Sequence, residues 1–166
     1  MARHKITPFL WFDGQAEEAA AFYVSLFPDS AVTGVTPGQD GAAMVVEFRL
    51  AGAHYYLALN GGPHFKFTEA VSLSVDCQTQ AEVDELWDKL STGGSKGRCG
   101  WLKDKYGLSW QVIPSALPEL MGGADRAKAG RVTAAMMGMT KLDIRGLRDA
   151  ADAAPPLEES ATEVGR

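Results

Sequence analysis

The sequence contains few of the residues that mark an exported or nucleic-acid-binding protein. Only two of its 166 residues are cysteine, Cys77 and Cys99, which is too few for a disulfide framework. Sixteen Lys and Arg against 21 Asp and Glu give a net charge of −5, so no basic surface for DNA or RNA is expected. The apolar run at 6–12 stops at Asp13, which is short for a signal-peptide core and far too short for a membrane span. We therefore expect a cytoplasmic protein with reduced thiols that binds neither nucleic acid nor membranes.

The composition and the apolar patterns indicate one globular domain built from repeated elements. Hydrophobic residues make up 46% of the chain and charged residues 22%, as in folded soluble proteins. The first half is expected to hold strands at 6–12, 31–36, 42–50 and 54–60, with a helix at about 17–27. The second half is expected to hold strands at 71–75, 98–103 and 108–113, with a helix at about 80–90. We interpret the two halves as successive βαβββ units.

The two halves also share residues at matching places. Asp13-Gly14-Gln15 recurs as Asp76-Cys77-Gln78, and Phe22-Tyr23 corresponds to Leu86-Trp87 if one extra residue is allowed. An internal repeat explains both matches, because neither unit could cover its apolar sheet face alone. The alternative is two unrelated helices that use common residue types.

The chain beyond Pro114 predicts a helical extension. A short helical turn is expected near Leu117, a longer helix at 126–139, and an apolar cluster that includes Leu142 and Leu147. The methionines of this segment are interpreted as core or interface filler. We expect a single domain at 1–149, with module one at about 5–61, module two at about 70–114, the extension at about 116–149, and a mobile tail at 150–166 rich in Ala, Pro, Glu and Asp.

Several stretches taken together resemble one known family. They are 6–19, 60–65, and 99–104 followed by Gly107 and Trp110-Gln111. This set, with the paired βαβββ order, resembles the vicinal oxygen chelate superfamily of glyoxalases, bleomycin-resistance proteins and extradiol dioxygenases. Within it, the chain is similar to the PhnB-like branch, often labelled 3-demethylubiquinone-9 3-methyltransferase. The resemblance implies an α+β fold with one cup-shaped sheet per module, and a homodimer.

The methyltransferase label can be compared with the glycine pattern. An S-adenosylmethionine site of the common kind needs a strand followed by a glycine-rich turn at the start of a helix. The glycine-rich stretches lie at 34–38, 60–63 and 93–100, and none opens a long helix after a strand. We interpret these glycines as hairpin turns, which argues against methyl transfer.

The metal site that the resemblance implies is also incomplete. Enzymes of this superfamily hold a divalent metal with His, Gln and Glu from the first and last strands of each module. At those places the chain has no His, Gln or Glu in 5–12, and it has Ala58, then Ser72 and Ser74, then Gln111. We therefore expect no metal and no cofactor. An unusual site could still use Glu47, His54 or His64, although each suits a solvated strand or a turn.

Without a metal, we expect the polar and aromatic side chains of the cup to bind the ligand. Alternation places Phe9 and Trp11 on one strand face, and the resemblance turns that face toward the cup. Cys99 and Trp101 are expected to share a face, and Ser109 and Gln111 another. The predicted binding residues are Phe9, Trp11, Cys99, Trp101, Ser109 and Gln111. A dry aromatic core or a dimer interface is the alternative, and Cys99, with no histidine partner to place, is expected to be a buried structural thiol.

Three functions remain open from the sequence. The first is binding of a small aromatic or amphipathic molecule in the cup, with an unknown reaction. The second is metal-free sequestration of a toxic compound, as in bleomycin-resistance relatives. The third is the methyltransferase activity of the family label.

Overall fold

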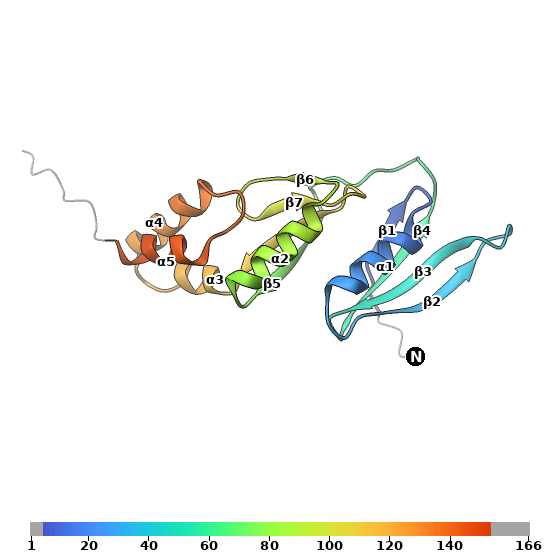
Figure 1. The fold of residues 1–166 in the computed structure, drawn as a ribbon, viewed down its shortest axis with the longest axis horizontal. Helices are drawn as coiled ribbons and strands as arrows, with labels where there is room; N and C mark the ends of the chain where they lie inside the picture. Colours follow the sequence, from blue (N-terminus) through green and yellow to red (C-terminus); the bar gives the residue numbers. More distant parts are fainter. Residues whose placement is uncertain (1–4, 154–166) are drawn as a thin grey trace, which may run out of the picture.

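The computed structural model describes residues 5–153 and shows two βαβββ modules side by side (Figure 1). Module one contains β1 (Phe9–Phe12), α1 (Ala16–Leu26), β2 (Ala31–Pro37), β3 (Ala43–Leu50) and β4 (His54–Asn60). Module two contains β5 (Ser72–Cys77), α2 (Gln80–Ser91), β6 (Ser95–Lys96), β7 (Trp101–Lys103) and β8 (Ser109–Pro114). The sheets have the orders β1-β4-β3-β2 and β5-β8-β7-β6, and the first strand of each module runs parallel to the last. This architecture confirms the predicted α+β fold and its repeat.

Each helix covers one face of its own sheet. In module one, Leu10 and Phe12 lie on the face of β1 that α1 covers, and both are buried. Phe9 lies on the opposite face of the strand and is 55% exposed. Small residues of α1, Ala19 and Ala20, allow the helix to lie close to the strands. The two helices lie on the same side of the molecule in Figure 1, so the opposite faces of both sheets carry no helix.

The start of α2 follows from its capping residues. Thr79 is extended and its hydroxyl accepts a hydrogen bond from the backbone N of Glu82. The Glu82 carboxylate in turn accepts from the backbone N of Gln78 at 2.7 Å, so two otherwise unpaired donors are satisfied. Val83, Leu86, Trp87 and Leu90 are the buried apolar residues of the helix. The predicted helix at 80–90 is confirmed, with one more residue at its end.

The predicted strand at 98–103 is wrong in its first half. β7 begins only at Trp101, because Cys99 and Gly100 have φ angles of 56° and 81° and form a turn. Their backbone N–H groups donate to the carbonyl oxygens of Met139 and Thr140, both at 2.8 Å. Cys99 and Trp101 therefore do not share a strand face. The hydrogen bonds that fix this turn come from residues about 40 positions later, so the local sequence pattern could not predict it.

Three helices follow the second sheet and form a core of their own. They are α3 (Ala116–Met121), α4 (Arg126–Met137) and α5 (Ile144–Asp152). Leu117, Val132, Leu142, Leu147 and Ala151 form this buried cluster. Met136 and Met139 pack against it as apolar filler. Because α5 continues to Asp152, the segment from 150 to 152 is helical rather than part of a tail, and residues 154–166 lie outside the described part. No helix among the described residues is long and apolar enough to cross a membrane.

Candidate functional site

The helix-free face of the first sheet carries two of the predicted residues. Phe9 and Trp11 lie on it, opposite the buried Leu10 and Phe12. Trp11 is fixed there, because its indole Nε1 donates to the carbonyl oxygen of Gly62 at 2.8 Å. Its ring meets the edge of the exposed Phe65 ring at a centroid distance of 4.9 Å. These contacts form an aromatic surface at the edge strand.

A glycine makes the position of Trp11 possible. A Cβ atom on Gly61 would lie 2.3 Å from two carbon atoms of the Trp11 ring. Any larger residue at position 61 would therefore move the indole. The motif at 60–65, which contributes to the family resemblance, thus positions an aromatic side chain.

The helix-free face of the second sheet carries three more predicted residues. Trp101 pairs with Gln111 across β7 and β8, and Lys103 pairs with Ser109. Gln111 donates from Nε2 to the Ser72 hydroxyl on β5 at 2.9 Å. The face is therefore polar and partly aromatic, whereas Trp110 on the same strand faces the helix side and is buried. The structure brings Trp101, Ser109 and Gln111 together.

Ser109 is the unusual member of this group. Its side chain is fully buried at 0% exposure, and its hydroxyl has no hydrogen-bond partner within residues 5–153. It lines a cavity of about 120 Å³ together with Trp101, Lys103, Glu69 and Ser95. A buried hydroxyl without a partner is rare in folded proteins, since its desolvation costs free energy that no bond returns.

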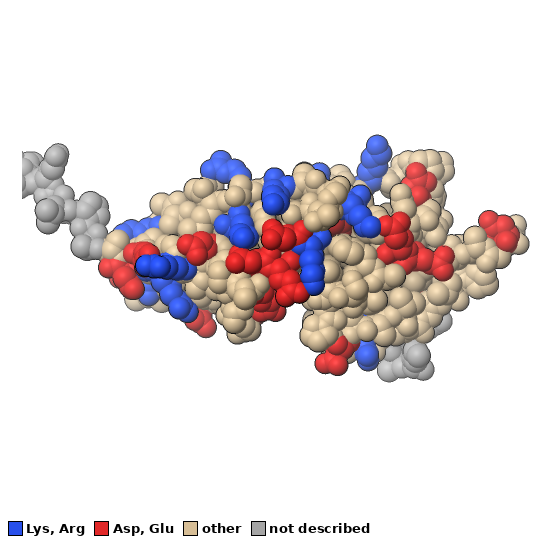
Figure 2. Space-filling view, in the orientation of Figure 1, with Lys and Arg blue, Asp and Glu red and all other residues tan. Residues whose placement is uncertain are grey.

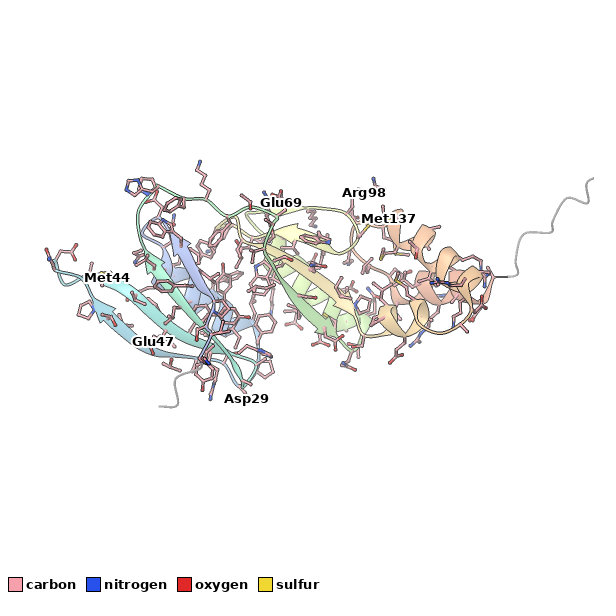
Figure 3. The ribbon with its side chains drawn as sticks, turned by 180° about the vertical axis from the view of Figure 1, so that it is seen from behind. Asp29, Met44, Glu47, Glu69, Arg98 and Met137 are labelled. Carbon is pink, nitrogen blue, oxygen red and sulfur yellow. The ribbon has the colours of Figure 1, made fainter. Side chains whose placement is uncertain are left out.

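Glu69 is a cavity residue that the sequence did not single out. It lies in the connection between the modules, where Figure 3 labels it, and its carboxylate forms an ion pair with Lys103 at 2.7 Å. The hydrogen bond from Lys103 lowers the pKa of Glu69. Nothing in the local pattern at 61–71 indicates that this connection passes over β7, so only the fold could reveal it.

Cys99 lies apart from these residues. Its Sγ is 3.6 Å from the Sδ of Met137 in α4, and the neighbouring Arg98 donates from Nη2 to the Met137 carbonyl at 2.6 Å. Figure 3 shows Arg98 and Met137 beside each other where module two meets the helical extension. The thiol is half-buried rather than buried as predicted, and through this contact it contributes to the docking of α4.

The donor set does not fit the metal of the superfamily. The described part of the chain holds no group of three or more His, Cys, Asp and Glu side chains placed to bind a metal ion. Glu47 lies on β3 with Gly34 as its cross-strand partner, and Figure 3 shows it on the first sheet. His54 begins β4 and His64 lies in the following loop, both exposed. On the second sheet, positions 72 and 74 hold serine, whose neutral hydroxyl is a weak ligand, and Gln111 is the one residue of an implied ligand type at these three positions.

A buried carboxylate on the helix side of the second sheet connects the two modules through hydrogen bonds. Asp104 is 2% exposed, and Oδ2 accepts from the Tyr23 hydroxyl at 2.7 Å and from Trp110 Nε1 at 2.8 Å. Oδ1 accepts from the backbone N of Tyr106 and of Leu108. Burial raises the pKa of Asp104, while these four donors act in the opposite direction. Because Tyr23 belongs to α1, this network locks module one onto module two.

Comparisons with known proteins agree on the architecture. The sequence profile of the family described as 3-demethylubiquinone-9 3-methyltransferase matches residues 4–113. The PhnB protein from Bacillus cereus, which carries the same methyltransferase name, is 35% identical over 68% of this chain and 100% of its own, with a TM-score of 0.63. Protein PA1353 from Pseudomonas aeruginosa is 20% identical over 68% of this chain and 98% of its own, with a TM-score of 0.57. No curated protein sequence matches the chain.

Proposed function

Because the chain belongs to the 3-demethylubiquinone-9 3-methyltransferase family, in the PhnB-like branch of the vicinal oxygen chelate superfamily, we propose that it binds a small aromatic or amphipathic molecule on the helix-free face of module two. The observation that supports this most strongly is the buried Ser109 hydroxyl, which lines a cavity without a hydrogen-bond partner in residues 5–153. A ligand group that enters the cavity and displaces the side chains covering this hydroxyl would satisfy it.

The volume and the walls of the cavity limit which part of a ligand can enter it. At about 120 Å³ it is smaller than a complete ligand site, so it would take one polar end of the molecule. Trp101 lies at its wall and Gln111 is the cross-strand neighbour of Trp101, which gives the ring of the ligand an aromatic and an amide surface. The binding residues are then Trp101, Ser109 and Gln111.

The chemistry of these side chains favours binding without conversion. The group includes no histidine or cysteine, and the carboxylate of Glu69 is held by Lys103. A general base or nucleophile needs a free group with a suitable pKa, which this arrangement does not offer. Sequestration, the second function open from the sequence, is therefore the form of the proposal that we favour.

The methyltransferase name is not supported by a cofactor site. The connections from β1 to α1 and from β5 to α2 contain one glycine, Gly14, whereas Gly93, Gly94 and Gly97 lie between α2 and β7. The glycine-rich segments thus do not open a helix after a strand. We expect S-adenosylmethionine to give no binding heat with the purified chain.

The first module exposes aromatic side chains that suit a dimer interface. Phe9 and Phe65 are exposed beside Trp11, which is unusual for large apolar side chains in such a group. We expect a second copy of the chain to cover them in a homodimer.

The substitution Ser109→Ala tests the proposed site. It removes an unpaired buried hydroxyl, so it is expected to raise the free energy of unfolding by about 1 kcal/mol in the ligand-free protein. It is also expected to weaken binding of phenol or benzamide about fivefold, because the ligand loses a hydrogen bond. Thermal unfolding and isothermal titration calorimetry measure the two effects.

Ser72→Ala is the matched control on the neighbouring strand. Ser72 pairs with Ser109 across β5 and β8, but its hydroxyl accepts from Gln111, so its removal should lower stability. If both substitutions lowered stability alike, the Ser109 hydroxyl would be satisfied in the free protein, and the proposal would lose its main support.

A further inference from the structure

A second cavity lies between the two modules, and none of the proposed binding residues Trp101, Ser109 and Gln111 lines it. It has a volume of about 360 Å³ and shares no lining residue with the Ser109 cavity. The end of α1, the start of β4, and parts of β5, α2 and β8 form its walls. Figure 2 shows the corresponding notch between the two halves of the molecule, with Asp and Glu atoms gathered over α2 beside it. We call this cavity the inter-module groove.

Aromatic side chains form much of the groove wall. Phe27 stacks on Trp110 with ring centroids 6.1 Å apart, and Tyr56 stacks on Phe48 at 5.3 Å. Phe27, Tyr56 and Trp110 all line the groove. Burial raises the pKa of Tyr56, which keeps its hydroxyl neutral. An apolar ligand body would therefore find a preformed aromatic surface.

The charged side chains of the groove are all acidic. Asp76 and Glu82 line it, together with His54, and no Lys or Arg of the described chain does so. Asp76 accepts hydrogen bonds from Gln78 Nε2 and the Ser115 hydroxyl, and Glu82 accepts from the Gln78 backbone. Within residues 5–153 neither carboxylate has a Lys or Arg in ion-pair distance.

Cys77 is a buried thiol next to these two carboxylates. It lies between them along the chain. Burial, followed by repulsion from Glu82 and Asp76, raises the pKa of Cys77 to about 12. Because the charged residues that line the groove are the carboxylates of Asp76 and Glu82, a positive group there would meet favourable electrostatics, and an anion would be repelled.

We propose that the inter-module groove binds an organic amine cation with an aromatic or aliphatic body. Two carboxylates without basic partners select the charge, and three aromatic residues select the apolar body. The volume lies within the range of small-molecule sites, about 300–1,000 Å³. A bare metal ion is a poor occupant, because no cluster of three ligating side chains occurs among the described residues. This site is independent of the function proposed for module two.

The charge of the ligand is tested with three indoles of similar size. Calorimetry at low ionic strength compares tryptamine, its neutral analogue tryptophol, and the anion indole-3-propionate. Tryptamine is expected to bind at least about tenfold more tightly than tryptophol, with no binding of the anion, and added salt should weaken it. Equal affinity for tryptamine and tryptophol, or no tryptamine binding at all, would overturn the proposal.

Substitutions that preserve size locate the amine. Asp76→Asn and Glu82→Gln are each expected to raise the Kd of tryptamine about tenfold, and Gln at 82 can still accept the Gln78 hydrogen bond. Asp88→Asn is the control, since Asp88 is exposed on the same helix and does not line the groove. Gln111→Leu should also leave tryptamine binding unchanged.

Two results would contradict this location. A similar loss in Asp88→Asn would show that net charge alone attracts the amine. A loss in Gln111→Leu would place the amine on the helix-free face of module two, and the function proposed for that face would survive while the groove proposal failed. Thermal unfolding of each variant confirms that the fold is retained.

Discussion

Replacing Asp104 with alanine is expected to lower the free energy of unfolding by about 4 kcal/mol, which corresponds to a fall in Tm of about 10 °C for a chain of this size. The carboxylate is buried and accepts four hydrogen bonds from Tyr23, Trp110 and two backbone N–H groups. Alanine leaves all four donors without an acceptor. Each such donor costs about 1–3 kcal/mol when it stays dry, and partial relaxation limits the sum.

Two further substitutions distinguish the loss of these hydrogen bonds from the loss of a negative charge. Tyr23→Phe removes one donor and leaves the other three bonds, so it is expected to cost about 1 kcal/mol. Asp88→Ala, which removes an exposed carboxylate from α2, should change stability by less than about 0.5 kcal/mol. Chemical denaturation measures all three. A cost for Asp104→Ala as small as that for Asp88→Ala would show that Asp104 does not hold the modules together.

The second large effect is expected from Gly94→Ala. A Cβ atom at position 94 would lie 2.0 Å from the Lys103 carbonyl oxygen and 2.7 Å from the Asp104 carbonyl carbon. Both are backbone atoms, so the connection before β6 would have to move away from the strand. We expect a loss of about 3 kcal/mol. This close approach also keeps Ser95 and Lys103 at the Ser109 cavity, so binding of phenol should weaken as well.

The same chemical change elsewhere in the chain should have the opposite sign. Gly130 lies in the interior of α4, and a Cβ atom there would meet nothing within 4 Å. Gly130→Ala is therefore expected to raise stability by about 0.5–1 kcal/mol through helix propensity. Denaturation of the two variants under one condition makes the comparison. A stabilising Gly94→Ala would show that the connection is not packed as the structure has it.

Local patterns were enough to predict the repeated modules except for β6 (Ser95–Lys96), a two-residue strand that lies within the stretch interpreted as turns. Alternation on β1 separated Leu10 and Phe12 from Phe9 and Trp11, and helical spacing located α2 to within one residue. Such patterns are visible because a half-buried strand and an amphipathic helix each have a fixed period. The faces of Trp101, Ser109 and Gln111 follow in the same way once the strands are known.

Features that depend on distant segments could not be predicted. Cys99 adopts a positive φ because residues 139 and 140 accept the hydrogen bonds of its turn. Asp104 could be placed in a turn, but its burial depends on Tyr23, which lies 81 positions earlier. Glu69 joins the Ser109 cavity only through the path of the connection over β7, and Asp76 joins the inter-module groove only through the packing of one module on the other.

The central claim is that module two binds a small molecule on its helix-free face, and the indole N–H signals of the four tryptophans test it most directly. The ¹⁵N-labelled protein is titrated with phenol and benzamide, and the signals are assigned with Trp→Phe variants. We expect the Trp101 signal to shift and saturate, while that of Trp87, buried in the helix–sheet core, stays in place. A Trp101 signal that stays constant with every probe, or that moves no more than that of Trp87, would contradict it.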